Sequence, residues 1–227
     1  MTGFLDIASY TILLILPPLV AFILNRLSYA SFNYEPVLIG GGLLMLTLII
    51  QPPVQVALGR GVSNLAAKAL IAGLIAGLIQ EGLKLIAIVK LYSGSIRQGF
   101  YIGFGFGLAE WGLTLVFTGI VLVLGLQSID PLIGFFGAIE RISSIIFHTA
   151  SATLLACFVA LRQVWKGYIL ISLFHGAIDW MAAYLHVMSA LNNYLAIGLM
   201  EAFWLAASVV LLFIGLRGVK IAEEQAC

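Results

Sequence analysis

Residues 66–90 read AAKALIAGLIAGLIQEGLKLIAIVK, and this stretch indicates the fold. The run is long and apolar enough for an α-helix to cross the hydrocarbon core of a bilayer, which is ~30 Å thick. Glu81 and Lys84 lie inside it. A charged side chain in hydrocarbon costs at least ~2.5–3.5 kcal/mol on insertion scales. Each of these two residues therefore needs a partner, a bound water or a functional role.

Similar apolar runs recur along the whole chain of 227 residues, of which 62% are hydrophobic and only 9% charged. The sequence predicts an all-α polytopic membrane protein of about seven transmembrane helices around a buried polar cavity. Residues 1–227 then form a single integral membrane domain, and the motif-bearing core covers about 66–187. We expect Pro52 and Pro53 to break or kink the second span. The predicted spans are 6–25, 37–58, 66–90, 98–125, 133–161, 168–187 and 194–216.

The basic residues near the ends of these spans are distributed unequally between the two membrane faces. One face holds Arg26, Lys90, Arg97, Arg162, Lys166, Arg217 and Lys220, whereas the other holds only Arg60 and Lys68. Because loops rich in Lys and Arg stay in the cytoplasm, the first face is predicted to be cytoplasmic. The N-terminus is then outside and the C-terminus inside. A net charge of +1 gives no basic footprint for nucleic acid.

Ionisable residues of four predicted spans fall at similar depths. At a rise of 1.5 Å per residue, Glu81 and His175 lie about 14 Å from the cytoplasmic ends of their helices. Glu110, His148 and Asp179 lie about 20 to 21 Å from theirs. A layer of carboxylates and imidazoles from different helices is typical of a functional site.

Helical spacing also places polar residues on shared faces. Gly73, Gly77 and Glu81 recur every four residues, so a neighbouring helix can approach closely beside Glu81, which can pair with Lys84. Gly103, Gly107 and Glu110 share a second face. Glu110 has no basic residue one turn away, so its partner must come from another helix. A polar stripe is predicted for Arg141, Ser144, His148 and Ser151. Glu201, in the last span, is unassigned: the alternatives are pairing with Arg141 or Lys84, or lining a substrate path.

These residues also resemble a known family. Glu81-x-x-Lys84, Phe106-x-x-x-Glu110 and His175-x-x-x-Asp179 are similar to the three motifs of the PrsW-type intramembrane peptidases, and Glu140-Arg141 followed by His148 resembles the related YhfC branch. Both groups belong with the type II CAAX prenyl endopeptidases and the ABI proteins. The resemblance covers about residues 70–185. Gln80 stands where the first motif commonly has a second glutamate, and the prenyl endopeptidases have a histidine where this chain has Glu110.

The resemblance implies hydrolysis of a peptide bond within the membrane by a glutamate-activated water. Glu81 is our predicted general base, and His175, oriented by Asp179, is the predicted oxyanion donor or water holder. Glu110 and His148 complete the water site. The predicted catalytic residues are thus Glu81, Glu110, His148 and His175, supported by Lys84, Arg141 and Asp179. No cofactor is expected; the alternative is a divalent metal such as zinc held by the same four catalytic residues.

The expected partners are the lipid bilayer and a membrane-protein or lipidated peptide substrate, with no nucleic acid. Two other functions compete with the peptidase. A proton- or ion-coupled transporter also uses intramembrane Glu, His and Asp residues, but transporters usually contain internal repeats, and the two halves of this sequence show no convincing one. A non-catalytic membrane scaffold would use the polar residues for packing alone.

Overall fold

The structure, a computed structural model, describes residues 4–28, 32–126, 131–187 and 193–226. All seven predicted helices are present, and each is long and apolar enough to span a membrane, which confirms the all-α polytopic fold class. The last helix continues beyond its predicted end at residue 216, because hydropathy marks only the apolar part of a helix. The helices are α1 (Phe4–Ser28), α2 (Tyr34–Gly59), α3 (Leu65–Tyr92), α4 (Ile96–Val123), α5 (Pro131–Ala160), α6 (Val164–Val187) and α7 (Tyr194–Ala226).

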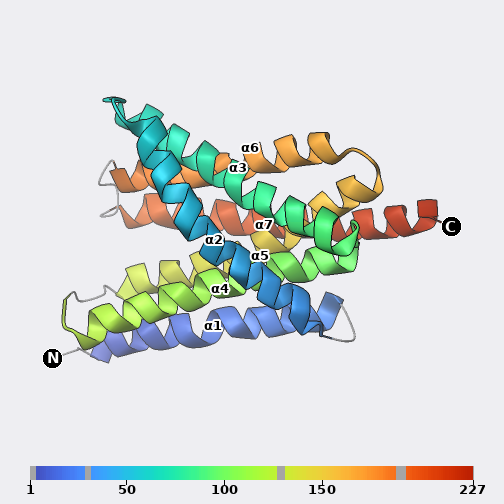
Figure 1. The fold of residues 1–227 in the computed structure, drawn as a ribbon. Coiled ribbons are helices and arrows are strands. Elements are labelled where there is room, and N and C mark those ends of the chain that lie inside the picture. Colours follow the sequence, from blue (N-terminus) through green and yellow to red (C-terminus); the bar gives the residue numbers. More distant parts are fainter. Residues whose placement is uncertain (1–3, 29–31, 127–130, 188–192, 227) are drawn as a thin grey trace.

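Helix α5 is the centre of the bundle. It packs against α1, α3, α4, α6 and α7, and 83% of its most apolar window is buried. Helices α3 and α6 form one side of the bundle, α1 and α4 form the other, and α2 crosses obliquely over α3 and α4 (Figure 1). Side chains that point from α5 therefore face the interior of the protein rather than lipid.

Glycines allow the helices that carry the polar residues to approach closely. A Cβ atom at Gly77 of α3 would lie 2.2 Å from the carbonyl oxygen of Ser172 on α6. A Cβ atom at Gly103 of α4 would lie 2.0 Å from the carbonyl oxygen of His148 on α5. Contacts this short leave no room for a side chain, so the predicted glycine faces are the contact surfaces of these helix pairs.

The two prolines of α2 do not break it. The helix is continuous from Tyr34 to Gly59 with Pro52 and Pro53 inside it, so of the two predicted outcomes, a break or a kink, the break is wrong. Each proline removes one backbone donor without ending the helix, and this leaves the carbonyl groups of Leu48 and Ile49 without their usual helical partners.

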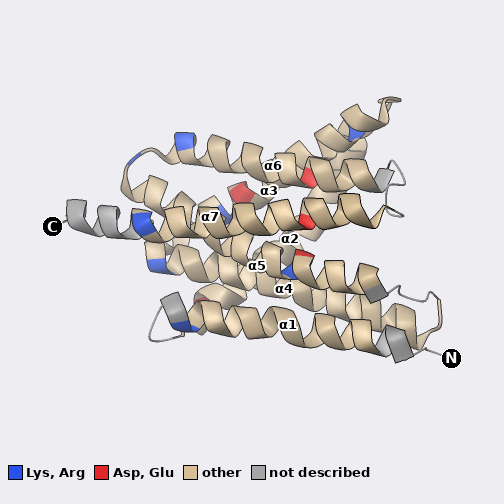
Figure 2. Cartoon of the chain, turned by 180° about the vertical axis from the view of Figure 1, so that it is seen from behind, with Lys and Arg blue, Asp and Glu red and all other residues tan. Residues whose placement is uncertain are grey.

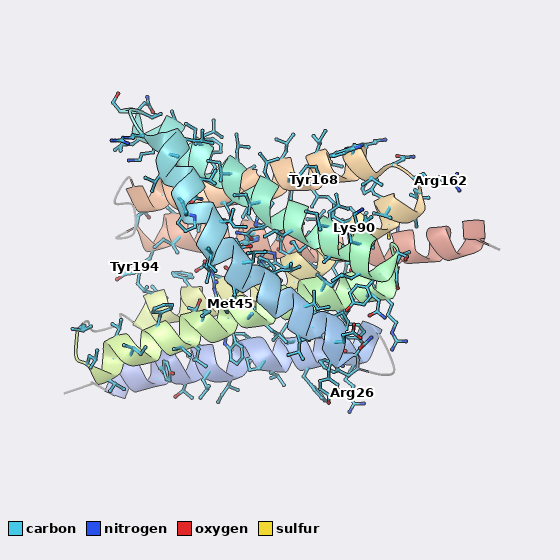
Figure 3. All side chains as sticks on the ribbon, viewed as in Figure 1. Arg26, Met45, Lys90, Arg162, Tyr168 and Tyr194 are labelled. Atoms are coloured by element: carbon cyan, nitrogen blue, oxygen red, sulfur yellow. The ribbon has the colours of Figure 1, made fainter. Side chains whose placement is uncertain are left out.

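The termini lie at opposite ends of the bundle, as seven crossings require (Figure 1). Away from the centre, Lys and Arg gather mainly at the end that carries the C-terminus (Figure 2). Arg26, Lys90 and Arg162 all lie toward that end, and Tyr194 lies toward the other (Figure 3). The helices thus bring together basic residues that the sequence assigns to one membrane face. That this face is cytoplasmic remains a prediction.

Candidate functional site

A cluster of polar side chains between α3, α5 and α6 is closed off from the surface. The Nζ atom of Lys84 lies 2.6 Å from Oε1 of Glu81, and Nδ1 of His175 lies 2.7 Å from the same oxygen. The side chains of Glu81 and Lys84 are completely buried, and that of His175 is 3% exposed. We call Glu81, Lys84 and His175 the sealed cluster. The predicted pairing of Glu81 with Lys84 is confirmed.

Lys84 connects this cluster to α5. Besides its bond to Glu81, its Nζ atom lies 2.8 Å from Oγ of Ser151 and 3.1 Å from Nδ1 of His148. It also lies 5.2 Å from the ring centroid of Phe106, within the range of a cation–π contact. An ammonium group has three hydrogens to donate, and these three acceptors use all of them. Lys84 is therefore fully satisfied although it is completely buried.

His148 lies between two groups of charged side chains. Lys84 offers only donors, so Nδ1 of His148 accepts. The hydrogen of the neutral ring is then on Nε2, which lies 3.0 Å from Oε2 of Glu110 and donates to it. The contacts of the ring thus determine its tautomer.

A second cluster lies on the other side of His148. Arg141 donates to Oε1 of Glu110 at 2.8 Å and also pairs with Glu140, while Ser144 donates to Oε2 of Glu110. The side chains of Glu110 and Glu140 are 29% and 36% exposed. We call Glu110, Arg141, Ser144 and Glu140 the cavity cluster. The partners of Glu110 come from α5, as predicted, and the predicted polar stripe of α5 faces inward as a unit.

The four predicted catalytic residues therefore belong to one connected network, and each lies close to the middle of its helix. Figure 2 shows acidic segments near the middle of the bundle from several helices. The network runs across the bundle from α6 through α3 and α5 to α4. This juxtaposition agrees with the depth argument from the sequence; the catalytic roles remain predictions.

The carboxylates of Glu81 and Glu110 differ in their free acceptor capacity. Both oxygens of Glu110 accept hydrogen bonds. In Glu81, by contrast, Oε1 accepts two, whereas the buried Oε2 has no partner among the described residues. A buried carboxylate oxygen without a donor is costly, so we expect a water molecule to hydrogen-bond to it.

A cavity of about 470 Å³ lies between α2, α3, α4 and α5. Glu110 and Arg141 form part of its wall, and so do Gln51, Gln80 and Leu48. The side-chain amide of Gln80 donates to that of Gln51 at 3.1 Å. The cavity therefore reaches the cavity cluster, whereas Glu81, next to Gln80 in the sequence, does not line it.

The alternative prediction from the sequence is a metal site, and the distances between its predicted ligands can now be compared. Ligand atoms of Glu81, His148 and His175 all lie within 4.8 Å of one another, a set to which Glu110 does not belong. However, Lys84 donates to Oε1 of Glu81 and to Nδ1 of His148. A metal bound through these two atoms would need the lone pairs that the ammonium group already occupies. Lys84 therefore competes with a metal for these two atoms, whereas Oε2 of Glu81 has no partner among the described residues. The metal alternative stays a prediction, and the mechanism below uses no metal.

The predicted contact of His175 with Asp179 is present, but the sequence did not indicate its contact with Glu81 or the surroundings of Glu201. Both ring nitrogens of His175 face carboxylates, Nδ1 at 2.7 Å from Glu81 and Nε2 at 3.5 Å from Asp179. His175 therefore holds the predicted base directly, and neither nitrogen is directed at open space. Glu201 lies in a different cavity, between α5, α6 and α7, together with Glu140. The contacts from Lys84 to α5 could have been anticipated from the stripe that contains Ser151; the pair Gln51–Gln80 had no such signal.

Comparisons of this chain with protein-family models, with curated proteins and with solved structures found no match.

Proposed function

We propose that this protein is an intramembrane endopeptidase that hydrolyses a peptide bond of a membrane-associated substrate with a water activated by Glu81. The observation that carries the proposal is Oε2 of Glu81, which has no partner among the described residues and lies in the middle of a membrane-spanning bundle beside two imidazoles. Hydrolysis needs a water, a base and a donor for the oxyanion. In the network, Glu81 can hold the water and act as the base, and a neighbouring N–H group can act as the donor, all near the middle of the bundle.

In this mechanism Glu81 accepts a proton from water through Oε2, while Lys84 and His175 hold Oε1 in place. The water oxygen attacks the carbonyl carbon of the substrate. Lys84 lies next to Glu81 and is the donor that stabilises the oxyanion, by turning one of its three N–H groups from its present acceptor to the substrate oxygen. Glu81 then returns its proton to the leaving amine.

The cavity beside Glu110 is the proposed route for the substrate. Its wall combines the side-chain amides of Gln51 and Gln80 with Leu48, whose carbonyl group lacks a helical donor because of Pro52. Such groups can pair with the backbone of a peptide that has been unwound from its helix. Since Glu110 and Arg141 close the inner end of the cavity, the substrate reaches Glu81 only when this pair separates.

The transporter is the second candidate, and the direction of the network argues against one form of it, a continuous proton wire across the membrane. The side chains form a path across the bundle, from α6 to α4, with every member near the middle of its helix. A proton pathway between two aqueous compartments would have to run along the helices instead.

The test is reconstitution of the purified protein in liposomes with a panel of single-span membrane proteins, followed by mass spectrometry of cleavage products. The native protein should cleave a member of the panel, and Glu81→Gln should not. Glu35→Gln, which changes an exposed carboxylate at the start of α2, is the control and should cleave normally. Addition of a chelator should not change the rate. Proton or ion flux without cleavage would refute the peptidase and support the transporter.

A further inference from the structure

A second cavity of about 470 Å³ lies between α5, α6 and α7, away from the sealed cluster. Its wall is mostly apolar, with side chains such as Phe136, Ala183 and Ile197, and it contains two carboxylates, Glu140 and Glu201. Since Ile133 and Leu185 also line it, the cavity extends toward the end of the bundle opposite the C-terminus.

Glu201 is the unusual member of this wall. Its residue is 3% exposed, and its Oε2 has no hydrogen-bond partner among the described residues. The two basic side chains near the centre are already engaged, Lys84 by Glu81 and Arg141 by Glu110 and Glu140. A buried carboxylate without a cation or donor is strongly unfavourable. Glu201 therefore needs a positively charged or hydrogen-bond-donating partner, and the described part of the chain does not supply one.

The lining indicates what kind of partner fits. A bare inorganic cation would use the carboxylates but leave the apolar wall unoccupied. A neutral lipid tail would fill the apolar part of the cavity but leave the carboxylates without a partner. An amine on an apolar chain satisfies both parts of the cavity, and the volume is within the usual range of small-molecule sites, ~300–1,000 Å³.

We infer that this cavity binds a primary ammonium group carried on an apolar chain, with Glu201 as its main acceptor and Glu140 as the second. The inference does not depend on the proposed peptidase activity, because it concerns binding at a separate cavity.

The probe is octylammonium, with octanol as its neutral counterpart, measured by equilibrium dialysis against the protein in phosphatidylcholine nanodiscs and corrected with empty nanodiscs. The native protein should bind octylammonium at least about tenfold more tightly than octanol. Glu201→Gln should weaken octylammonium binding roughly 10- to 100-fold, because a hydrogen bond to a charged group is lost. Octanol binding should not change.

Two further variants separate binding from folding. Glu35→Gln removes an exposed carboxylate outside the cavity and should bind both probes normally. Ala183→Leu narrows the cavity without changing a charge and should weaken both probes. Equal affinity of the native protein for the two probes, or an octylammonium affinity that Glu201→Gln leaves unchanged, would overturn the inference.

The source of the natural ammonium is tested by competition. If nanodiscs that contain phosphatidylethanolamine reduce octylammonium binding, the ammonium is that of a lipid headgroup, since phosphatidylcholine has no N–H to donate. If they do not, the ligand is a free amphiphilic amine.

Discussion

The sealed cluster and the cavity cluster contain similar side chains but have different surroundings. In each, a carboxylate pairs with one cationic side chain and contacts one histidine ring. Glu81 pairs with Lys84 and contacts His175, and Glu110 pairs with Arg141 and contacts His148. The side chain of Glu81 is completely buried, and one of its oxygens has no partner in the described part of the chain, whereas the side chain of Glu110 is 29% exposed and both of its oxygens accept hydrogen bonds. In the proposed mechanism this difference divides the roles: the sealed cluster activates water, and the cavity cluster receives the substrate.

The largest expected effect tests this division directly. Glu81→Gln should lower the rate of peptide cleavage about 10²- to 10⁴-fold, the usual contribution of a general base. Glu110→Gln should lower it only about tenfold, because residue 110 does not activate the water and its amide oxygen still accepts from Arg141. The loss comes from the new NH2 group, which replaces the oxygen that accepts from Ser144 and His148. The measurement is the initial rate of substrate cleavage in liposomes. A larger loss for Glu110→Gln would move the base to the cavity cluster.

The next largest effect concerns stability. Lys84→Met should destabilise the protein by about 3–5 kcal/mol, because the carboxylate of Glu81 stays buried without its cationic partner. Arg141→Met should cost only about 1–2 kcal/mol, since Glu110 and Glu140 reach cavities where water can solvate them. Unfolding by sodium dodecyl sulfate in mixed micelles, followed by circular dichroism, measures both.

A double variant identifies the cause of this loss. If the unpaired charge is responsible, Lys84→Met combined with Glu81→Gln should recover most of the stability. If the double variant is as unstable as Lys84→Met, the loss comes from packing rather than charge.

The third prediction compares the packing on the two sides of the network. Gly77→Ala should destabilise the protein by about 1–3 kcal/mol, because the new methyl group would meet the carbonyl oxygen of Ser172 on α6. Gly112→Ala is the matched control on α4, where no neighbouring atom of the described residues lies within 4 Å of the added Cβ. This control should be neutral or stabilise the helix by up to about 1 kcal/mol. Equal losses would mean that the seal between α3 and α6 does not depend on close contact.

Much of this arrangement follows from the sequence, since hydropathy and helical spacing report local properties. The seven spans, the glycine face around Gly77 and the polar stripe from Arg141 to Ser151 are all consequences of the residue pattern of one helix. How far each helix turns about its axis against its neighbours is not local. For that reason the sequence could not show that Glu81 bonds to His175, that Glu110 bonds to His148, or that Gln51 and Gln80 meet at a cavity.

The smallest expected effect is that of Asp179→Asn. Its contact with Nε2 of His175 is 3.5 Å long and its side chain is 27% exposed, whereas Glu81 holds Nδ1 of the same ring at 2.7 Å. Since the shorter bond already fixes the ring, losing the charge at residue 179 should slow cleavage less than about tenfold, corresponding to less than ~1.4 kcal/mol. His175→Ala removes the shorter bond and should cost more, about 10²-fold, because the position of Glu81 is then held by Lys84 alone. Rates for both variants, with circular dichroism as a check of folding, measure the difference. If Asp179→Asn is as slow as His175→Ala, the long contact must tighten when substrate binds, and Asp179 would then belong with the sealed cluster.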